Sequence, residues 1–206
     1  MSDLSVFSFY PTKPLGGFGD GGMVLTSDEK LYNRLRRLRF YGMDKTYYAE
    51  ENGYNSRLDE LHAEVLLRKL KRLDVNNGRR RELAQRYTRL LGQTALKLPT
   101  EAPKNRHVYY LYVVAHPDRD RIMQELALRD IRLNISYPWP IHLMRGYRDL
   151  GYSEGDLPVT EAAAKTIFSL PMYPMLSEVD QDTVCSSLRQ VLSESAAWET
   201  QATAAC

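Results

Sequence analysis

The chain has 206 residues, 43% of them hydrophobic, and its 28 basic and 26 acidic residues leave a formal charge of only +2. This length and composition allow a buried core in one or two domains, and the near-neutral total does not indicate nucleic-acid binding. No apolar run approaches the roughly 18 residues of a membrane-spanning helix, and the N-terminus lacks the pattern of a secretory signal, so we expect a cytoplasmic protein without membrane contact.

Two short strands around a glycine-dense turn are expected first. Residues 5–10 are rich in aromatic side chains, which favours a strand, and a second strand is expected over the apolar and β-branched residues 23–26. The glycines of 15–22 permit a sharp turn or the close approach of a ligand. A helix is expected over 28–40, with Ser27 as its N-cap.

Lys13 stands between the first strand and the glycine-dense turn. Pro11 and Pro14 restrict the backbone on either side of it. A lysine held in a partly apolar pocket loses charge stabilisation, so its pKa falls and its free amine can condense with an aldehyde. Most lysines beside turns are solvated surface groups instead, so this segment alone leaves both interpretations open.

The turn also contains a G-x-G-x-x-G pattern, from Gly17 to Gly22. In dinucleotide-binding proteins this pattern opens a helix whose N-terminus holds the pyrophosphate. Here another strand is expected directly after the glycines. The context therefore argues against a dinucleotide site.

A long helical region is expected over 58–91, which Asn76-Asn77-Gly78 should kink or interrupt. Basic clusters within it are interleaved with leucine, as on the solvated face of an amphipathic helix. The two cysteines provide neither a disulfide framework nor a metal site. The later elements are a strand over 107–115, a helix over 119–129, a proline-rich loop at 138–140, helices near 160–166 and 178–192, and a disordered tail over 196–206.

Six segments match one known pattern in order. They are Phe7-Ser8-Phe9-Tyr10-Pro11-Thr12-Lys13 with Gly19-Asp20-Gly21-Gly22, Gly53-Tyr54-Asn55-Ser56-Arg57-Leu58-Asp59-Glu60-Leu61, His107-Val108-Tyr109, Tyr137-Pro138-Trp139-Pro140-Ile141-His142-Leu143, Gly155-Asp156-Leu157-Pro158-Val159-Thr160-Glu161 and Ser169-Leu170-Pro171-Met172-Tyr173-Pro174. Over about residues 5–195 the chain resembles the DegT/DnrJ/EryC1/StrS family of pyridoxal-phosphate-dependent sugar aminotransferases.

The resemblance implies an α/β fold, and the chain corresponds only to the C-terminal half of a family member. Residues 1–50 would be the last part of a fold-type-I large domain that binds pyridoxal phosphate, and 51–195 the long helix with a smaller α+β domain. The missing half carries the acidic partner of the cofactor's ring nitrogen, on which pyridoxal chemistry depends. We therefore expect a fragment, a truncated product or one part of a split enzyme.

By the same resemblance, Lys13 forms the Schiff base with pyridoxal phosphate and later moves a proton as acid and base. Ser8 donates its hydroxyl to the cofactor phosphate, and Asn55 reaches the phosphate of the neighbouring subunit in a homodimer. A plain strand serine and a loop-capping asparagine are the ordinary alternatives for these two residues.

Three further residues, His107, Tyr137 and His142, match positions near the substrate. Ser136 stands where the family often has histidine, and Met144 where it often has glutamine, so the choice between 3-keto and 4-keto sugars stays open. The function implied is transamination of a keto-deoxysugar nucleotide with glutamate as amino donor. A non-catalytic regulator that binds the cofactor or a sugar nucleotide, and an inert fragment, are the alternatives.

Overall fold

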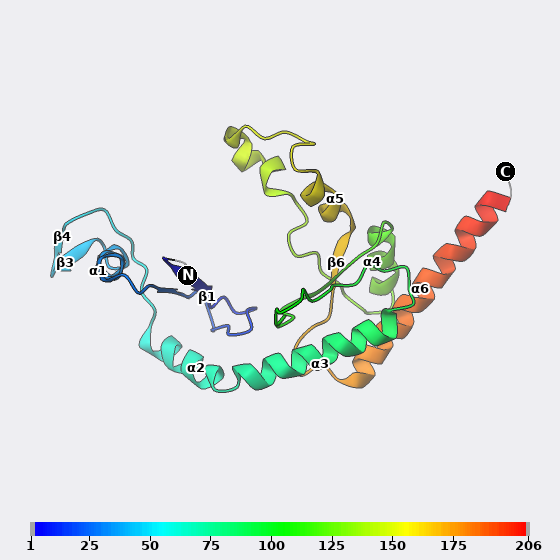
Figure 1. The fold of residues 1–206 in the computed structure, drawn as a ribbon, viewed down its shortest axis with the longest axis horizontal. Coiled ribbons are helices and arrows are strands. Elements are labelled where there is room, and N and C mark those ends of the chain that lie inside the picture. The colour runs from blue at the N-terminus through cyan, green and yellow to red at the C-terminus, as the bar shows by residue number, and fades with distance from the viewer. Residues whose placement is uncertain (1–2, 205–206) are drawn as a thin grey trace. The chain divides into compact units, whose positions relative to one another are not determined.

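The computed structural model describes residues 3–204, with side chains as far as residue 194, and Figure 1 gives the order of its elements. The chain groups into two compact units, Met1–Asn76 and Asn77–Cys206. This division falls later than residue 50, the predicted end of the first domain. The reason is that the helix after residue 59 makes its contacts with the N-terminal turn, as described below.

The first unit opens with an antiparallel pair of strands, β1 (Ser5–Ser8) and β2 (Gly22–Leu25), in which Val6 lies opposite Val24. Two strands around the glycine-dense turn are thus confirmed, although β1 ends at Ser8. No residue of either strand is buried. An isolated two-stranded sheet is only marginally stable in water, so this pair provides little of the core.

Helix α1 (Glu29–Leu38) follows β2. Its N-cap is Asp28, whose carboxylate accepts the Leu31 N–H at 2.9 Å. The prediction of Ser27 as N-cap was wrong by one residue, because the aspartate side chain satisfies the free amide of the first turn.

A small hairpin of β3 (Met43–Lys45) and β4 (Tyr48–Ala49) follows α1. Glu51, just after the hairpin, accepts hydrogen bonds from Arg37 at 3.0 Å and Arg34 at 3.1 Å. These guanidinium groups, Arg37 first, lower the pKa of Glu51. The sequence predicts a plain loop here, and the ion pairs show how that segment is tied to α1.

The long helical region is two helices, α2 (Glu60–Leu70) and α3 (Leu73–Leu91). The predicted interruption at Asn76-Asn77-Gly78 was wrong, because these residues lie inside α3 and the break falls at Lys71–Arg72. A Cβ at Gly78 would meet nothing within 4 Å. A glycine in an open helical position costs about 1 kcal/mol relative to alanine, which the packing of α3 tolerates.

The second unit is built on an antiparallel pair, β5 (Tyr112–Ala115) and β6 (Ile167–Leu170). The strand expected over 107–115 is therefore shorter, and β6 was not expected. The other elements are α4 (Arg119–Ala127), the short 3-10 helices η1 (Ile141–Leu143) and η2 (Arg145–Leu150), α5 (Pro158–Thr166) and α6 (Glu178–Ala204). The core of the second unit includes the fully buried residues Leu83, Tyr87, Leu91, Tyr112, Ile122, Leu126, Phe168, Leu188 and Val191.

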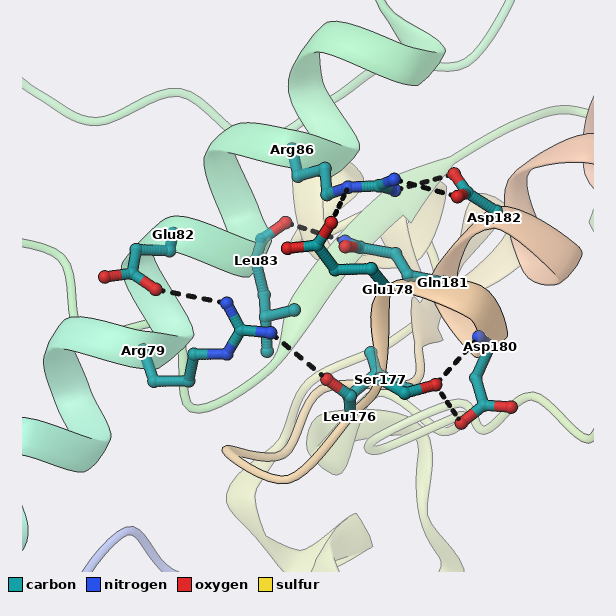
Figure 2. Close-up of polar contacts among 10 residues, drawn as sticks. All are labelled: Arg79, Glu82, Leu83, Arg86, Leu176, Ser177, Glu178, Asp180, Gln181 and Asp182. Atoms are coloured by element: carbon teal, nitrogen blue, oxygen red, sulfur yellow. Dashed lines mark hydrogen bonds and ion pairs between the residues drawn. The ribbon is translucent and has the colours of Figure 1, made fainter.

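Helices α3 and α6 are joined by polar contacts as well as by the core (Figure 2). Arg86 donates to both carboxylate oxygens of Asp182, at 2.7 and 2.8 Å. Gln181 is fully buried and its amide donates to the Leu83 carbonyl at 2.8 Å. Cys185 is buried on the same helix, and burial raises the pKa of its thiol to about 11.

Helix α6 continues to Ala204, over most of the segment for which the sequence predicts a disordered tail; residues 205 and 206 lie outside the described residues. The tail holds no glycine or proline and is rich in alanine, which has the highest helix propensity. Within residues 3–204, none of the helices has the length and apolar character needed to cross a bilayer. The same residues contain no group of three or more histidines, cysteines or carboxylates placed to hold a metal ion.

Candidate functional site

The segment from Phe9 to Gly21, which we call the lysine loop, is closed by its own backbone. Phe9 N–H donates to the Gly21 carbonyl at 2.8 Å, and Gly17 N–H donates to the Phe9 carbonyl at 2.7 Å. Phe9 is buried. One anchored residue therefore closes both the base of the loop and the inner turn of residues 10–16.

Lys13 lies in that inner turn. Its backbone N–H donates to the Tyr10 carbonyl at 2.9 Å, and the residue is partly buried. Ser8, at the end of β1, is exposed, and its hydroxyl accepts the Tyr10 N–H at 3.3 Å. The structure thus brings Ser8 and Lys13 onto one short, hydrogen-bonded segment. A Cβ at Gly16 would lie 2.4 Å from the Pro11 carbonyl oxygen, so this turn can close only with glycine there.

Helix α2 supports the other side of the lysine loop. Phe18 N–H donates to His62 Nε2 at 3.3 Å, and Lys69 Nζ donates to the Gly16 carbonyl. A Cβ at Gly17 would lie only 1.6 Å from His62 Nε2, so the imidazole occupies the space that a side chain would need. His62 and Lys69 are about two helical turns apart and share one face. That face is the platform on which the loop rests.

Sequence reasoning predicts His62 as a partly buried packing residue on the expected helix, and the structure agrees, but it identified neither the contact of His62 with the lysine loop nor any role for Lys69. Their spacing on an expected helix was visible, but the Phe18–His62 contact joins residues 44 positions apart. Nothing local indicates which loop a helix face will meet. The glycines at 16 and 17 were the available signal, because adjacent glycines often mark a close approach of other atoms.

Asn55 lies in the loop before α2, where its backbone forms an antiparallel bridge with Phe40. Its side chain is exposed, and Oδ1 accepts a hydrogen bond from Arg57 Nε at 3.0 Å. The Arg57 guanidinium lies 5.5 and 5.6 Å from the ring centroids of Phe40 and Tyr41. Asn55 is therefore oriented by a cation–π cluster at the surface of the first unit.

His107 belongs to the second unit and is exposed. Its Nδ1 accepts the Tyr109 N–H at 2.9 Å, and its backbone N–H donates to Glu101 at 2.6 Å. Arg81 donates to the same carboxylate and to the His107 carbonyl. Arg81, followed by the His107 amide, lowers the pKa of Glu101. The imidazole is thus held in one orientation at the surface.

Tyr137 and His142 differ in exposure, although both match the same motif. Tyr137 is 78% exposed and has a positive φ of 70°. His142 is buried, and its Nε2 lies 2.9 Å from a carboxylate oxygen of Glu161. Tyr137 is accessible to a ligand, whereas the geometry of His142 favours a structural role. Substrate contact by His107, Tyr137 and His142 stays a prediction.

This chain is similar to one family of known proteins. The model of the DegT/DnrJ/EryC1/StrS aminotransferase family matches residues 1–189. The dTDP-3-amino-3,4,6-trideoxy-alpha-D-glucose transaminase of Micromonospora megalomicea subsp. nigra is 52% identical over 198 residues, which cover 93% of this chain and 53% of that protein. The pleiotropic regulatory protein of Geobacillus stearothermophilus is 41% identical, with 92% and 52% covered.

Solved structures agree with this similarity. DesV of S. venezuelae, solved in complex with a ketimine intermediate, is 41% identical with a TM-score of 0.87, covering 91% of this chain and 51% of DesV. The family resemblance and the α/β fold class are thereby confirmed. The chain spans about half the length of the relatives that it matches.

Pyridoxal phosphate is the cofactor of this family, and the residues of the lysine loop fit it. The cofactor needs a primary amine for its aldehyde and hydrogen-bond donors for its phosphate. Lys13 offers the amine, Ser8 offers a hydroxyl, and the closely packed glycines let main-chain amides approach a ligand. The donor set of the first unit is therefore compatible with this cofactor.

Proposed function

Because the chain belongs to the DegT/DnrJ/EryC1/StrS aminotransferase family, we propose that it supplies the lysine-bearing half of a pyridoxal-phosphate-dependent aminotransferase for keto-deoxysugar nucleotides. The observation that carries this proposal is the closed lysine loop, which holds a partly buried Lys13 five residues after the Ser8 hydroxyl. When bound, the cofactor supplies the electron sink that allows an amino group to move between two carbon atoms.

Each residue of the proposed site has a distinct role. Lys13 Nζ would hold the cofactor by its aldehyde carbon, and its amine would accept and return a proton at the reacting carbon. Ser8 donates its hydroxyl to the cofactor phosphate. Asn55 contacts the cofactor phosphate bound to a second copy of the chain, so the proposed assembly is a homodimer. Arg57 keeps the Asn55 amide in place through the hydrogen bond at 3.0 Å.

The proposed substrate is a sugar nucleotide with a ketone, and glutamate is the proposed amino donor. The name of the Micromonospora relative, a transaminase of a 3-amino sugar, supports a 3-keto over a 4-keto sugar. Of the three predicted contact residues, Tyr137 and His107 are exposed, whereas His142 is buried. The cytoplasmic location expected from the sequence stays part of this proposal.

The proposed amino transfer uses residues from both halves of the length that the relatives have. The relatives are about twice as long, and the carboxylate that keeps the cofactor's ring nitrogen protonated is expected in the other half of their length. We therefore propose that the chain binds the cofactor weakly alone and becomes active when a polypeptide equivalent to that half is present.

The test begins with the bond between Lys13 and the cofactor. The chain is mixed with pyridoxal phosphate, reduced with borohydride and digested, and the modified lysine is located by mass spectrometry. We expect modification at Lys13 that Lys13→Ala abolishes and that Lys45→Ala, a change at an exposed residue of β3, leaves intact. Equal labelling of many lysines would refute the assignment.

Amino transfer is then measured with a dTDP-3-keto sugar and glutamate, with and without the N-terminal half of the Micromonospora relative. Product formed only with both polypeptides, and lost in Lys13→Ala, is the expected result. A complex that labels Lys13 but transfers no amino group would contradict the aminotransferase proposal.

A regulatory function is the second candidate, because one relative is named a pleiotropic regulatory protein. It predicts cofactor or sugar-nucleotide binding without turnover. Isothermal titration with each ligand, run beside the transfer assay, separates the two functions.

A further inference from the structure

We propose that His62 is a positioning residue whose neutral imidazole fixes the lysine loop and thereby sets the presentation of Lys13. The proposal rests on the proposed function of Lys13, but its evidence is a set of contacts within the first unit that involve no cofactor. Those contacts are a hydrogen bond, a steric fit and a second support from the same helix face.

The hydrogen bond defines the chemical state of the ring. Phe18 N–H donates to His62 Nε2 at 3.3 Å, so this nitrogen carries no proton and the neutral ring keeps its proton on Nδ1. An imidazolium has a donor at both nitrogens and cannot accept this bond. The contact therefore requires the neutral form of His62.

The steric fit sets the distance between α2 and the loop. The ring occupies the place of a side chain at Gly17, where a Cβ would lie 1.6 Å from Nε2. A Cβ at Gly21 would lie 3.6 Å from His62 Cε1. The imidazole thus packs beside two glycines of the lysine loop. Its volume fills the space at these glycines, and its Nε2 accepts the Phe18 N–H.

The contact is transmitted to Lys13 through the backbone. Phe18 follows Gly17, whose N–H closes the inner turn on the Phe9 carbonyl at 2.7 Å. That turn contains Lys13. Lys69 supports the same turn from α2 through the Gly16 carbonyl. Displacing His62 therefore removes one of the contacts that hold the turn containing Lys13.

Three variants separate the acceptor from the volume. His62→Gln keeps an acceptor oxygen on a side chain of moderate length, whereas His62→Leu keeps apolar volume and removes the acceptor. His116→Leu is the matched control, because His116 Nδ1 also accepts a backbone N–H, that of Asp118 at 3.0 Å, in the second unit.

The first measurement is residue-resolved hydrogen exchange on the full chain without cofactor. In His62→Leu, the Phe18 amide should exchange on the order of fivefold to tenfold faster, as expected for the loss of one hydrogen bond. His62→Gln should stay within about twofold of the wild type on the same scale, and His116→Leu should leave the loop unchanged.

The second measurement is the rate at which Lys13 is trapped by pyridoxal phosphate and borohydride. It should change in His62→Leu and recover in His62→Gln. Unchanged Phe18 exchange in His62→Leu would overturn the proposal, as would an unprotected Phe18 amide in the wild type or His62→Gln behaving as His62→Leu does. If no variant traps the cofactor, the proposed function fails, while the exchange rates still decide the role of His62.

Discussion

Glu161 and His142 form a buried pair, with 2.9 Å between a carboxylate oxygen and Nε2 and side chains only 10% and 5% exposed. The same carboxylate accepts the Gly155 N–H at 3.0 Å and the Leu157 N–H at 3.2 Å. Glu161 thereby joins α5 to the preceding loop and to η1. This arrangement gives His142 a structural partner at a position where the family resemblance predicts substrate contact.

The pair predicts a specific acid sensitivity. His142, followed by the two backbone amides, lowers the pKa of Glu161 below its ordinary value of 4.5. The unfolded chain therefore takes up this proton at a higher pH than the folded chain, so the stabilisation is complete above pH 4.5 and is lost as the pH falls through the folded-state pKa.

Melting temperatures measured from pH 7 down to pH 3 test this expectation. Glu161→Gln should melt below the wild type at neutral pH and show a shallower fall in acid. Glu154→Gln, a change in the same loop at an exposed residue, serves as control. If the melting temperatures of the wild type and Glu161→Gln fall equally as the pH is lowered, the role of this carboxylate is contradicted.

Arg80 is predicted to be a major structural residue of the second unit. Its buried guanidinium donates to the carbonyls of Tyr109, Tyr110 and Met172 at 3.3, 3.1 and 2.8 Å, and burial lowers its pKa. Arg80→Met leaves these acceptors without their donor, so we expect the free energy of unfolding to fall by about 3 kcal/mol.

The neighbouring Arg79→Met is the control for Arg80→Met. Arg79 is partly exposed, pairs with Glu82 at 3.1 Å and makes one long hydrogen bond, 3.5 Å, to the Leu176 carbonyl, so its loss should cost less than about 1 kcal/mol. Urea unfolding of both variants makes the comparison. Equal costs would show that the three carbonyl contacts contribute little.

In the lysine loop, the sequence predicts the local structure but not the contacts that support it. The strands on each side, the glycine-dense turn and the position of Lys13 follow from local propensity, because aromatic strands and glycine turns are determined by nearby residues. The support by His62 and Lys69 does not, because it depends on how a helix 44 positions away packs.

The same distinction explains the errors in the helices. Gly78 suggested a break that its open position did not require, whereas the real break at Lys71–Arg72 holds neither glycine nor proline. In the second unit, the motif around His142 predicts substrate contact but does not reveal that the ring is buried. Burial is a property of the tertiary fold, and motif matching alone does not supply it.

Alanine substitutions at Gly17 and Gly19 of the lysine loop should have very different effects. Gly17→Ala places a Cβ 1.6 Å from His62 Nε2, whereas a Cβ at Gly19 meets nothing within 4 Å. We expect Gly17→Ala to increase exchange of the Phe18 amide and to slow trapping of Lys13 by pyridoxal phosphate. Gly19→Ala should behave as the wild type does.

A double variant locates the cause of the Gly17→Ala effect. If the clash with the imidazole is responsible, His62→Ala in the Gly17→Ala background should remove part of the defect in Lys13 trapping. A defect that is simply additive in the double variant would point to backbone strain at residue 17 instead.

The two strand pairs should differ in hydrogen exchange. No residue of β1 or β2 is buried, whereas Tyr112 and Val114 of β5 and Phe168 and Leu170 of β6 lie in the core. Because exchange in core strands requires more extensive unfolding, amides of β5 and β6 should exchange more than about a hundredfold slower than those of β1 and β2. Mass spectrometry of the full chain measures both pairs in one sample.

The same measurement tests the proposal that a complementary polypeptide stabilises the first unit. Strands with open edges and apolar side chains gain stability when further strands cover them, and Val6 and Phe7 of β1 are 75% and 49% exposed. Adding the N-terminal half of the Micromonospora relative should therefore slow exchange in β1 and β2 and leave β5 and β6 unchanged. Protection that rises equally in both pairs would indicate non-specific association, and no change in either would argue that this half does not complete the first unit.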